Sequence, residues 1–380
     1  MSEVRIRVEE RPPRVIAVLR GRDRPVPALW LRERSPDARH LDPQTQQRLF
    51  DPLALPDTLA LTGAAYAGED GLWLAFSDGY SGRFDLAALR RDLDPFDGCP
   101  EPRAWDATLD PLPVFSWRAA AGDRHLWEIL HAYLSLGFVI LRGVPTGPGS
   151  VLPAAECFGY VRETNFGRMF TVRHWPAGND LAYSGLRLAP HTDNPYRNPV
   201  PSIQLLLCVD NERLGGLSTL VDSLAVGAAL RQSDPDAFDL LTRVPVRFRF
   251  VDGKTDMIEH RPLITCDLHG RMTGAHFSPR LDYAPLMDAA DYRRFFRARA
   301  ALGRLFADPR FELTYRLKPG EMVMFDNRRL LHGRTAFDPR EGSRRLEGCY
   351  IESDGPRSLY RVLSRRRAER AGVPVAVEAV

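Results

Sequence analysis

The feature that most constrains the fold is a succession of short apolar segments after Pro201, separated by turn residues. Segments such as SIQLLLCV, VRFRFVD, FELTYRL, MVMFDN and LEGCYI have the length and composition of strands. Two helices are expected to interrupt the series, at Leu224–Gln232 and from Asp288 to about Phe306. Many short strands with a few covering helices predict a mainly β fold, with a double-stranded β-helix (jelly-roll) core.

The second of these helices is predicted from apolar residues at helical spacing. The expected apolar stripe consists of Tyr292, Phe295, Phe296, Ala300, Leu302 and Phe306. A third helix is expected around 124–137, where Leu126, Leu130 and Leu134 recur before Gly137.

A small β-rich domain is expected at residues 1–98. It contains the strand-like segments VRIRV and LWLAFSDGYSGRF, and the Asp78-Gly79 pair between alternating apolar residues predicts a hairpin. The stretch at 99–114 is rich in Pro and Asp, as linkers often are. This leaves 115–380 for the main domain.

The charge distribution excludes several classes of partner. The chain has 52 basic and 49 acidic residues, a formal charge of +3, and no long basic block, so we expect no nucleic-acid partner. No segment has the ~18 consecutive apolar residues of a membrane span. The charged N-terminus lacks the apolar core of a signal peptide. We therefore expect a cytoplasmic protein without a membrane partner.

The strongest chemical signal is His191-Thr192-Asp193, just before the strand SIQLLLCV, together with His332 after the strand MVMFDN. A His and an Asp two residues apart on a strand project to the same side. Two His and one carboxylate form the facial triad of non-haem Fe(II) oxygenases, which leaves coordination positions open. The sequence therefore predicts a catalytic iron centre made of His191, Asp193 and His332.

An arginine pair follows on what is expected to be the next strand. Arg344 comes twelve residues after His332 and is followed by Arg345, so one of the two points inward. An inward Arg344 can bind one carboxylate of a dicarboxylate whose other end chelates iron.

These motifs resemble the γ-butyrobetaine hydroxylase branch of the taurine-dioxygenase superfamily, which comprises Fe(II)- and 2-oxoglutarate-dependent oxygenases. The matching segments are His191-x-Asp193, GGLS at 215–218, FDNRRLLHGR at 325–334 and SRRLEGCY at 343–350, with WLRER at 30–34 and FSDGYSGRF at 76–84 in the small domain. The resemblance implies a homodimeric hydroxylase that uses iron, 2-oxoglutarate and oxygen. It also implies that Arg344 binds the far carboxylate of 2-oxoglutarate, with Ser218 as a supporting hydroxyl.

The small domain departs from that branch, which commonly holds zinc there with three Cys and one His. The corresponding stretch RERSPDARHLDP contains no Cys, and Tyr80 stands in the position of a His. Because thiolates dominate structural zinc sites, we expect no zinc, a domain held by its apolar core, and His40 at the surface.

The resemblance also indicates a substrate pocket. Positions that form an aromatic cage for a trimethylammonium group correspond to Phe166, Phe170, Tyr183 and Tyr350. All four are aromatic, and ring faces attract quaternary cations. Core packing is the alternative explanation for these rings.

Three polar positions bear on the rest of the substrate. Asp180 stands where butyrobetaine hydroxylases have an Asn that receives the substrate carboxylate, and it is also similar to trimethyllysine hydroxylases. Asn194 and Arg280 are expected to bind an anion. The combination resembles the branch that hydroxylates 2-(trimethylamino)ethylphosphonate next to phosphorus, which is our prediction.

Several alternatives stay open at this point. Within the oxygenases they are hydroxylases of γ-butyrobetaine, trimethyllysine or 2-aminoethylphosphonate. Outside them, the same triad is compatible with a zinc hydrolase or lyase, or with an inactive betaine-binding module, although neither explains Arg344.

Overall fold

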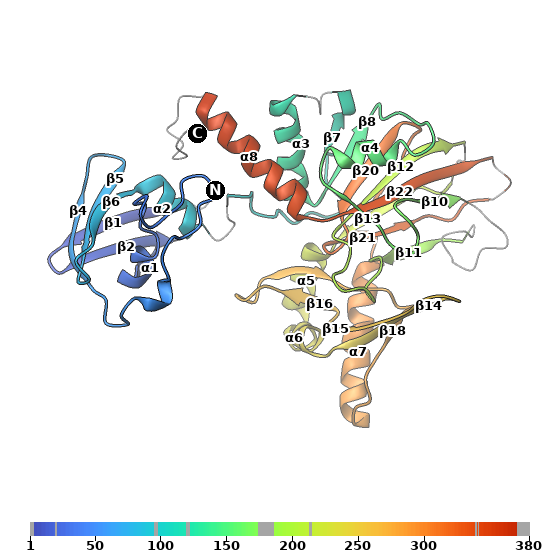
Figure 1. Cartoon of the computed structure of the whole chain (residues 1–380). Helices are drawn as coiled ribbons and strands as arrows, with labels where there is room; N and C mark the ends of the chain where they lie inside the picture. The colour runs from blue at the N-terminus through green and yellow to red at the C-terminus, as the bar shows by residue number, and fades with distance from the viewer. Residues whose placement is uncertain are drawn as a thin grey trace. The chain divides into compact units, whose positions relative to one another are not determined.

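The computed structural model describes residues 4–19, 21–94, 98–118, 122–173, 186–212, 215–338, 340 and 342–370. The chain divides into two compact units, one made of Met1–Glu101 and Ser364–Val380 and the other of Pro102–Leu363 (Figure 1). Among the described residues, no helix combines the length and apolar composition needed to span a membrane.

The N-terminal unit contains two three-stranded antiparallel sheets. One has the order β1 (Arg5–Glu10), β2 (Pro13–Leu19), β3 (Arg22–Pro25), and the other β4 (Leu61–Tyr66), β5 (Gly71–Phe76), β6 (Ser81–Asp85). The helices α1 (Ala28–Arg32) and α2 (Leu86–Leu93) and the 3-10 turn η1 (Pro52–Ala54) complete it. A single apolar core, which includes Leu31, Leu72 and Phe84, joins the sheets and helices.

The hairpin predicted at Asp78-Gly79 is confirmed. The backbone nitrogen of Phe76 donates to the carbonyl of Tyr80 at 2.8 Å. Gly79 adopts a φ of 86°, a conformation that glycine reaches without the steric cost that other residues incur.

The cysteine-free stretch of this unit is organised around the guanidinium of Arg32. Its Nε donates to a carboxylate oxygen of Asp78 at 2.8 Å. The guanidinium carbon lies 4.4 Å from the ring centroid of Tyr80 and 5.3 Å from that of Phe50. Arg32 is only 7% exposed. The buried cation of Arg32 thus joins α1, the β5–β6 turn and the loop between α1 and β4 that carries Phe50.

His40 belongs to the same cluster and is half-buried, which corrects the expectation of a surface residue. Its Nδ1 shares a hydrogen bond of 2.9 Å with the hydroxyl of Ser35, and its ring meets Phe50 and Tyr80 edge-on. Burial and the charge of Arg32 lower the pKa of His40. Among the described residues of this unit, no three potential metal ligands lie together. The absence of zinc stays a prediction.

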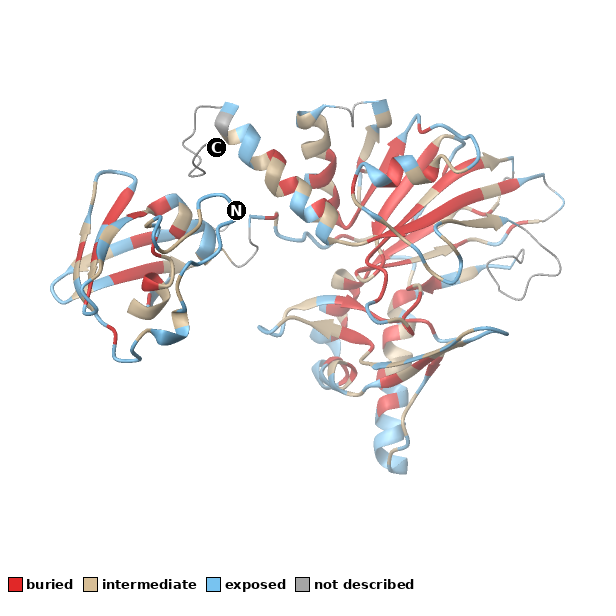
Figure 2. Ribbon diagram, in the orientation of Figure 1, coloured by how far each residue is buried: buried red, intermediate tan, exposed pale blue. Residues whose placement is uncertain are grey.

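The larger unit is built on two sheets, of which the larger has seven strands. Its order is β10 (Phe170–Arg173), β22 (Arg344–Ile351), β12 (Ile203–Asn211), β20 (Glu321–Asp326), β8 (Phe138–Arg142), β7 (Val114–Ser116), and β9 (Val161–Arg162) also pairs with β22. The helices α3 (Asp123–Leu136) and α4 (Val151–Glu156) pack on this sheet. Figure 2 shows that β12, β20 and β22 are buried over most of their length.

The smaller sheet carries both histidines of the predicted centre. Its order is β11 (Leu188–His191), β21 (Leu330–Arg334), β13 (Ser218–Asp222), β19 (Glu312–Tyr315). In the pairing of β11 with β21, His191 lies directly opposite His332.

A long insertion between β13 and β19 makes the chain mixed α/β, which corrects the expectation of a mainly β fold but not that of a jelly-roll core. It contains the helices α5 (Ser223–Ser233), α6 (Pro235–Arg243) and α7 (Ala289–Phe306) and the strands β14 (Val246–Val251), β15 (Asp256–Arg261), β16 (Ile264–Cys266), β17 (Met272–Ala275) and β18 (Asp282–Tyr283). After β22, the chain continues into α8 (Asp354–Arg370).

The helices α3, α5 and α7 confirm the predicted ones, whereas α6 was not predicted. Its start has a clear signal, because Asp234 accepts a hydrogen bond from the nitrogen of Ala237 and Pro235 occupies the first turn.

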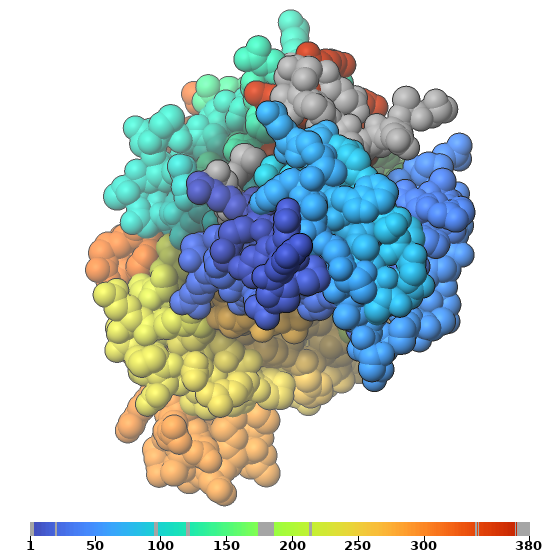
Figure 3. Space-filling view, turned by 90° about the vertical axis from the view of Figure 1, so that its left-hand side faces the viewer, coloured from blue at the N-terminus to red at the C-terminus, as the bar shows by residue number. Residues whose placement is uncertain are grey.

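The apolar stripe predicted for α7 is partly wrong. Phe295, Leu302 and Phe306 are buried, but Phe296 is 57% exposed and Tyr292 is 44% exposed. The exposed start of α7 stands out from the rest of this unit as orange atoms at the bottom of Figure 3.

Candidate active site

A cavity of about 620 Å³ is lined by strands of both sheets of the larger unit and by the insertion. Its lining includes buried side chains, among them Tyr315, Arg344 and Leu346, which we call the floor. It also includes the exposed side chains of Phe166, Val251 and Arg280, which we call the mouth.

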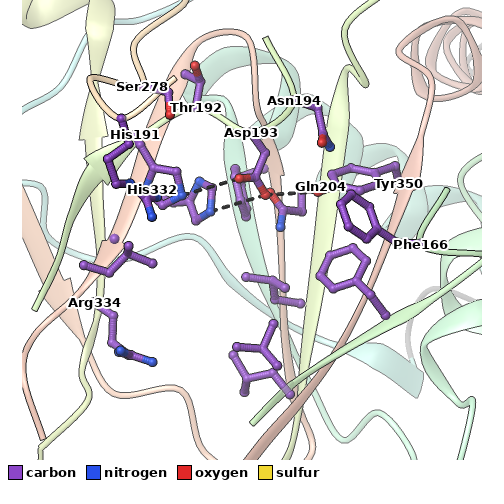
Figure 4. A pocket seen from close by; sticks show the side chains of 18 of the residues that line it. Phe166, His191, Thr192, Asp193, Asn194, Gln204, Ser278, His332, Arg334 and Tyr350 are labelled. Carbon is purple, nitrogen blue, oxygen red and sulfur yellow. Dashed lines mark hydrogen bonds and ion pairs between the residues drawn. The ribbon is translucent and has the colours of Figure 1, made fainter. Parts of the chain in front are cut away.

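His191, Asp193 and His332 meet in this cavity, as their spacing predicts (Figure 4). Each offers one ligand atom, and these atoms all lie within 4.8 Å of one another. Oδ1 of Asp193 is 3.4 Å from Nε2 of His191, and Oδ2 is 3.7 Å from Nε2 of His332. Elsewhere in the described ranges no comparable group of three metal-binding side chains occurs.

The protonation states at this group suit a divalent metal, which needs neutral imidazoles and an ionised carboxylate. Burial and the neighbouring His191 lower the pKa of His332 to about 3, although Asp193 opposes this. Burial alone would raise the pKa of Asp193, but the two histidines and a hydrogen bond from Tyr350 hold it well below its usual range. The residues present therefore fit an iron ion.

Neighbouring groups orient two of the three side chains. Nδ1 of His191 lies 3.0 Å from the carbonyl oxygen of Ala189. Because a carbonyl only accepts, Nδ1 carries the proton and Nε2 is left for a metal. The hydroxyl of Tyr350 donates to Oδ2 of Asp193 at 3.0 Å. Burial and the charge of Asp193 raise the pKa of Tyr350 well above its usual value.

The floor of the cavity contains the predicted Arg344 and Ser218. Arg344 lines the cavity, whereas its neighbour Arg345 does not. Ser218 pairs with Tyr315 across β13 and β19. Burial raises the pKa of Tyr315, while a hydrogen bond with Ser218 and the charge of Arg344 act in the opposite direction. These three side chains are therefore neighbours.

Two floor residues were missed by the sequence reasoning. Tyr315 gives no motif of its own. Arg334 is buried, donates to the carbonyl of Leu186 at 3.0 Å and lies 4.5 Å from the ring centroid of Phe337. The sequence feature that could have identified Arg334 is its position two residues after His332 on one strand, which places both side chains on the same face.

Three of the four predicted cage residues line the cavity, namely Phe166, Phe170 and Tyr350. The rings of Phe170 and Tyr350 have centroids 5.3 Å apart. Tyr183 and Asp180 lie outside the described residues.

Phe250 adds an aromatic ring that was not predicted. It meets Phe166 edge-on at 5.8 Å and stacks on Tyr196 at 5.0 Å between centroids. The sequence feature that could have identified Phe250 is the alternation in VRFRFVD, which places Phe248 and Phe250 on one face of β14.

The predicted anion-binding residues Asn194 and Arg280 also line the cavity, together with Ser278. Arg280 is close enough to His332 for its charge to contribute to the low pKa of that imidazole. Gln204 was missed. It is 2% exposed, and its Oε1 has no hydrogen-bond partner among the described residues. The sequence feature that could have identified Gln204 is its position as a polar residue inside the apolar strand SIQLLLCV.

Comparisons with known proteins agree with this geometry. The family model "Taurine catabolism dioxygenase TauD, TfdA family" matches residues 103–350. The γ-butyrobetaine dioxygenase of Pseudomonas sp. (strain AK-1) is 34% identical over 354 residues, covering 91% of this chain and 92% of that protein. The mitochondrial trimethyllysine dioxygenase of Rattus norvegicus is 28% identical over 356 residues, with coverages of 88% and 82%.

Solved structures show the same fold. AAD-2 in complex with Mn(II) and N-oxalylglycine aligns with a TM-score of 0.51 at 16% identity, over 66% of this chain and 97% of that chain. A taurine dioxygenase homologue from Burkholderia xenovorans, described as a 2-oxoglutarate (α-ketoglutarate)-dependent enzyme, gives a TM-score of 0.50 at 16% identity, over 67% and 94% of the two chains.

The fold, the His-Asp-His group and these relatives define a 2-oxoglutarate-dependent dioxygenase that uses iron. The chain belongs to the TauD/TfdA dioxygenase family, and its relatives support the γ-butyrobetaine branch. This membership replaces the hydrolase and binding-module interpretations that the sequence left open.

Proposed function

We propose that this dioxygenase hydroxylates a small quaternary-ammonium zwitterion, with 2-(trimethylamino)ethylphosphonate as the preferred substrate and the carbon next to phosphorus as the target. The observation that carries the proposal is that aromatic rings and anion-binding side chains line one cavity beside the His-Asp-His group. When bound, iron and 2-oxoglutarate supply the oxidation, with release of succinate and carbon dioxide.

In this proposal, His191, Asp193 and His332 hold the iron, and Arg344 holds the far carboxylate of 2-oxoglutarate, with Ser218 beside it. The low pKa of both Asp193 and His332 keeps those two side chains in the ligand form without a proton to lose. Buried Val323 and Leu346 and half-buried Leu206 line the cavity and suit the methylene groups of the co-substrate.

The aromatic wall supports recognition of the ammonium group. Phe166, Phe170 and Tyr350 provide ring faces, and Phe250 fixes Phe166 by an edge-on contact. A trimethylated nitrogen cannot donate hydrogen bonds, so attraction to ring faces is the contact open to it. The sequence resemblance assigns Tyr183 and Asp180 to recognition of the same group.

The polar side supports recognition of the anion. Asn194 and Ser278 are buried, and Arg280 provides the positive charge. The planar fork of an arginine matches the oxygens of a phosphonate or carboxylate. A short substrate held at both ends would present its anion-bearing carbon toward the metal-binding side chains.

γ-Butyrobetaine is the second candidate, because the relative with 34% identity is a γ-butyrobetaine dioxygenase. Trimethyllysine and 2-aminoethylphosphonate follow. Asp180 argues against butyrobetaine, since a carboxylate there would repel the substrate carboxylate.

The test is succinate formation by the Fe(II)-loaded protein with 2-oxoglutarate and each of the four amines. We expect the strongest stimulation by 2-(trimethylamino)ethylphosphonate, with one hydroxylated product per succinate. Stronger stimulation by γ-butyrobetaine would reassign the substrate. Stimulation by none of the four would overturn the zwitterion proposal.

Arg280→Ala tests the anion site. Losing one charged hydrogen-bonded contact costs about 1.5–3 kcal/mol, so we expect a tenfold or larger increase in KM for the amine. Uncoupled turnover of 2-oxoglutarate should persist. Arg293→Ala, an exposed residue of α7, is the matched control. Equal kinetics of the two variants would remove Arg280 from the site.

The homodimer implied by the sequence resemblance remains a prediction. Sedimentation equilibrium of the purified protein would decide it, since a monomer at micromolar concentration contradicts it.

A further inference from the structure

We propose that Tyr196 is a positioning residue for the substrate anion, acting through a directed chain of side chains that runs from Tyr196 through Asn194 and Tyr350 to Asp193. The inference rests on the proposed anion site and deepens it, because it assigns which atom of Asn194 faces the substrate.

The direction of the chain is set at Asp193. An ionised carboxylate only accepts hydrogen bonds, so the 3.0 Å contact with Tyr350 uses the proton of the Tyr350 hydroxyl. A tyrosine hydroxyl carries one proton at neutral pH, and this contact uses it. The Tyr350 oxygen is then left with lone pairs only.

The second step concerns the side-chain amide of Asn194, which lies beside the Tyr350 hydroxyl and interacts with it. Its Nδ2 is buried and makes no hydrogen bond of standard geometry with the described residues. An amide nitrogen that faces the Tyr350 oxygen is favourable, whereas an amide oxygen there would be repelled by the lone pairs of the hydroxyl. Because Tyr350 lines the cavity, the nitrogen lies on the cavity side of the amide.

The third step fixes the amide from behind. The hydroxyl of Tyr196 lies 2.5 Å from Oδ1 of Asn194 and donates to it. The ring of Tyr196 stacks on Phe250 at 5.0 Å and 23°, which holds the hydroxyl in position. The backbone of Asn194 has a φ of 54°, and its carbonyl accepts from the nitrogen of Arg197 at 3.1 Å.

An N–H of Asn194 is consequently offered to the cavity, next to the carboxylate residue of the metal group. A buried donor without a partner is costly until an acceptor arrives. An anionic oxygen of the substrate is the acceptor with the strongest interaction. Tyr196 selects for this oxygen through Asn194, because its hydroxyl prevents the amide from turning its oxygen to the substrate.

The experiment compares two ligands that share the cation and differ in the anion, 2-(trimethylamino)ethylphosphonate and propyltrimethylammonium. Dissociation constants are measured by calorimetry on protein loaded with Mn(II) and 2-oxoglutarate without oxygen. For Tyr196→Phe, which keeps the ring and its stacking, we expect 5- to 10-fold weaker binding of the phosphonate and less than 2-fold change for propyltrimethylammonium.

Two further variants complete the design. Tyr133→Phe removes a hydroxyl from another buried tyrosine outside the cavity and should change neither constant. In the double variant of Tyr196→Phe with Asn194→Ala, the phosphonate should bind as it does to Asn194→Ala alone, because residues that act in series are not additive.

Equal losses for both ligands, or additive losses in the double variant, would show that Tyr196 only supports packing, and would overturn the inference. A wild-type protein that binds both ligands equally would overturn it as well. If the wild-type protein prefers the phosphonate and Tyr196→Phe loses this preference, but no amine is hydroxylated, the proposed function fails and the positioning role stands.

Discussion

Asn327 accepts a hydrogen bond from the backbone nitrogen of Asp193 at 2.8 Å and donates one to the carbonyl oxygen of the same residue at 3.0 Å. Its amide also donates to the carbonyl of Pro201 at 3.0 Å. The two motifs of the predicted centre lie far apart in the chain, and one fully buried side chain joins them. The turn before β21 therefore fixes the backbone that carries the carboxylate.

Asn327→Ala should weaken both folding and metal binding. It leaves a buried N–H and carbonyl unpaired, at about 1–3 kcal/mol each, and it frees the backbone of Asp193. We expect a melting temperature lower by several degrees and an Fe(II) affinity reduced by roughly 10- to 100-fold, as is typical when supporting groups around metal ligands are removed. Competition with a fluorescent chelator measures the affinity.

The matched control for that variant is Asn211→Ala, which removes an amide donating to the carbonyl of Leu317 at 2.9 Å on another part of the sheet. It should lower stability without changing the Fe(II) affinity. Equal metal affinities of the two variants would contradict the role of Asn327.

Asp193→Ala should abolish both iron retention and succinate formation, because it removes one of three proposed ligands. Iron content after gel filtration and succinate released from 2-oxoglutarate are the two measurements. Asp252→Ala is the control, since Asp252 is an exposed carboxylate that also lines the cavity. Retention of stoichiometric iron by Asp193→Ala would refute the metal assignment.

Arg344→Ala should raise the KM for 2-oxoglutarate at least tenfold, since a charged hydrogen bond to a carboxylate contributes about 1.5–3 kcal/mol. Initial rates at varied 2-oxoglutarate provide the measurement. Arg345→Ala is a close control, because the two arginines are adjacent on β22 and only Arg344 lines the cavity. If Arg345→Ala had the larger effect, the assignment of the two arginines would be reversed.

The stability of the metal-free protein should depend on His276. Burial and then the charges of Arg261 and Arg328 lower its pKa to about 3. Between pH 3 and the ordinary value of 6.5 the unfolded chain binds a proton that the folded protein excludes. The free energy of unfolding therefore falls as pH drops through this window, by about 1.4 kcal/mol per pH unit for one histidine.

Urea unfolding of the wild type and His276→Gln at pH 7 and pH 5 tests this. The variant should lose less stability than the wild type on acidification, whatever its stability at pH 7. Equal losses in the two proteins would show that His276 is protonated in the folded state.

Arg32→Met should destabilise the N-terminal unit, because it leaves the carboxylate of Asp78 without its partner. Removing one member of a largely buried ion pair costs about 3–5 kcal/mol. Limited proteolysis followed by mass spectrometry would locate the cleavage within residues 1–101. Arg39→Met breaks the exposed pair with Asp37 and should have no measurable effect. Equal susceptibility of the two variants to proteolysis would contradict this role of Arg32, and one equivalent of zinc in the purified protein would contradict the expectation of no zinc.

The sequence predicted what is encoded locally. The His-x-Asp spacing, the second His after a strand and the arginine on the following strand depend on strand alternation, and the structure brings all four residues into one cavity. The Asp78-Gly79 hairpin and the long helix α7 were likewise visible in turn chemistry and periodicity.

Contacts across the chain were not visible in the same way. Phe250 reaches the cavity because the insertion after β13 folds back beside the 164–167 turn, where its ring meets Phe166. Asn327 acts on the backbone of Asp193, which lies far from it in the chain, and no local pattern in the sequence indicates this contact. The expectation of a mainly β fold was right only in part, because helices such as α4, α6 and α8 come in addition to the expected ones.

The floor of the cavity contains the buried Arg344 and Tyr315, and its mouth contains the exposed Phe166 and Arg280. In the proposed arrangement, with Arg344 holding the co-substrate, 2-oxoglutarate has to pass His191, Asp193 and His332 before an amine closes the mouth, and its dicarboxylate product has to leave by the same route. Steady-state kinetics should therefore show an obligatory order, in which 2-oxoglutarate binds first and succinate is released last. Excess amine should inhibit, because it can enter the cavity before 2-oxoglutarate has bound.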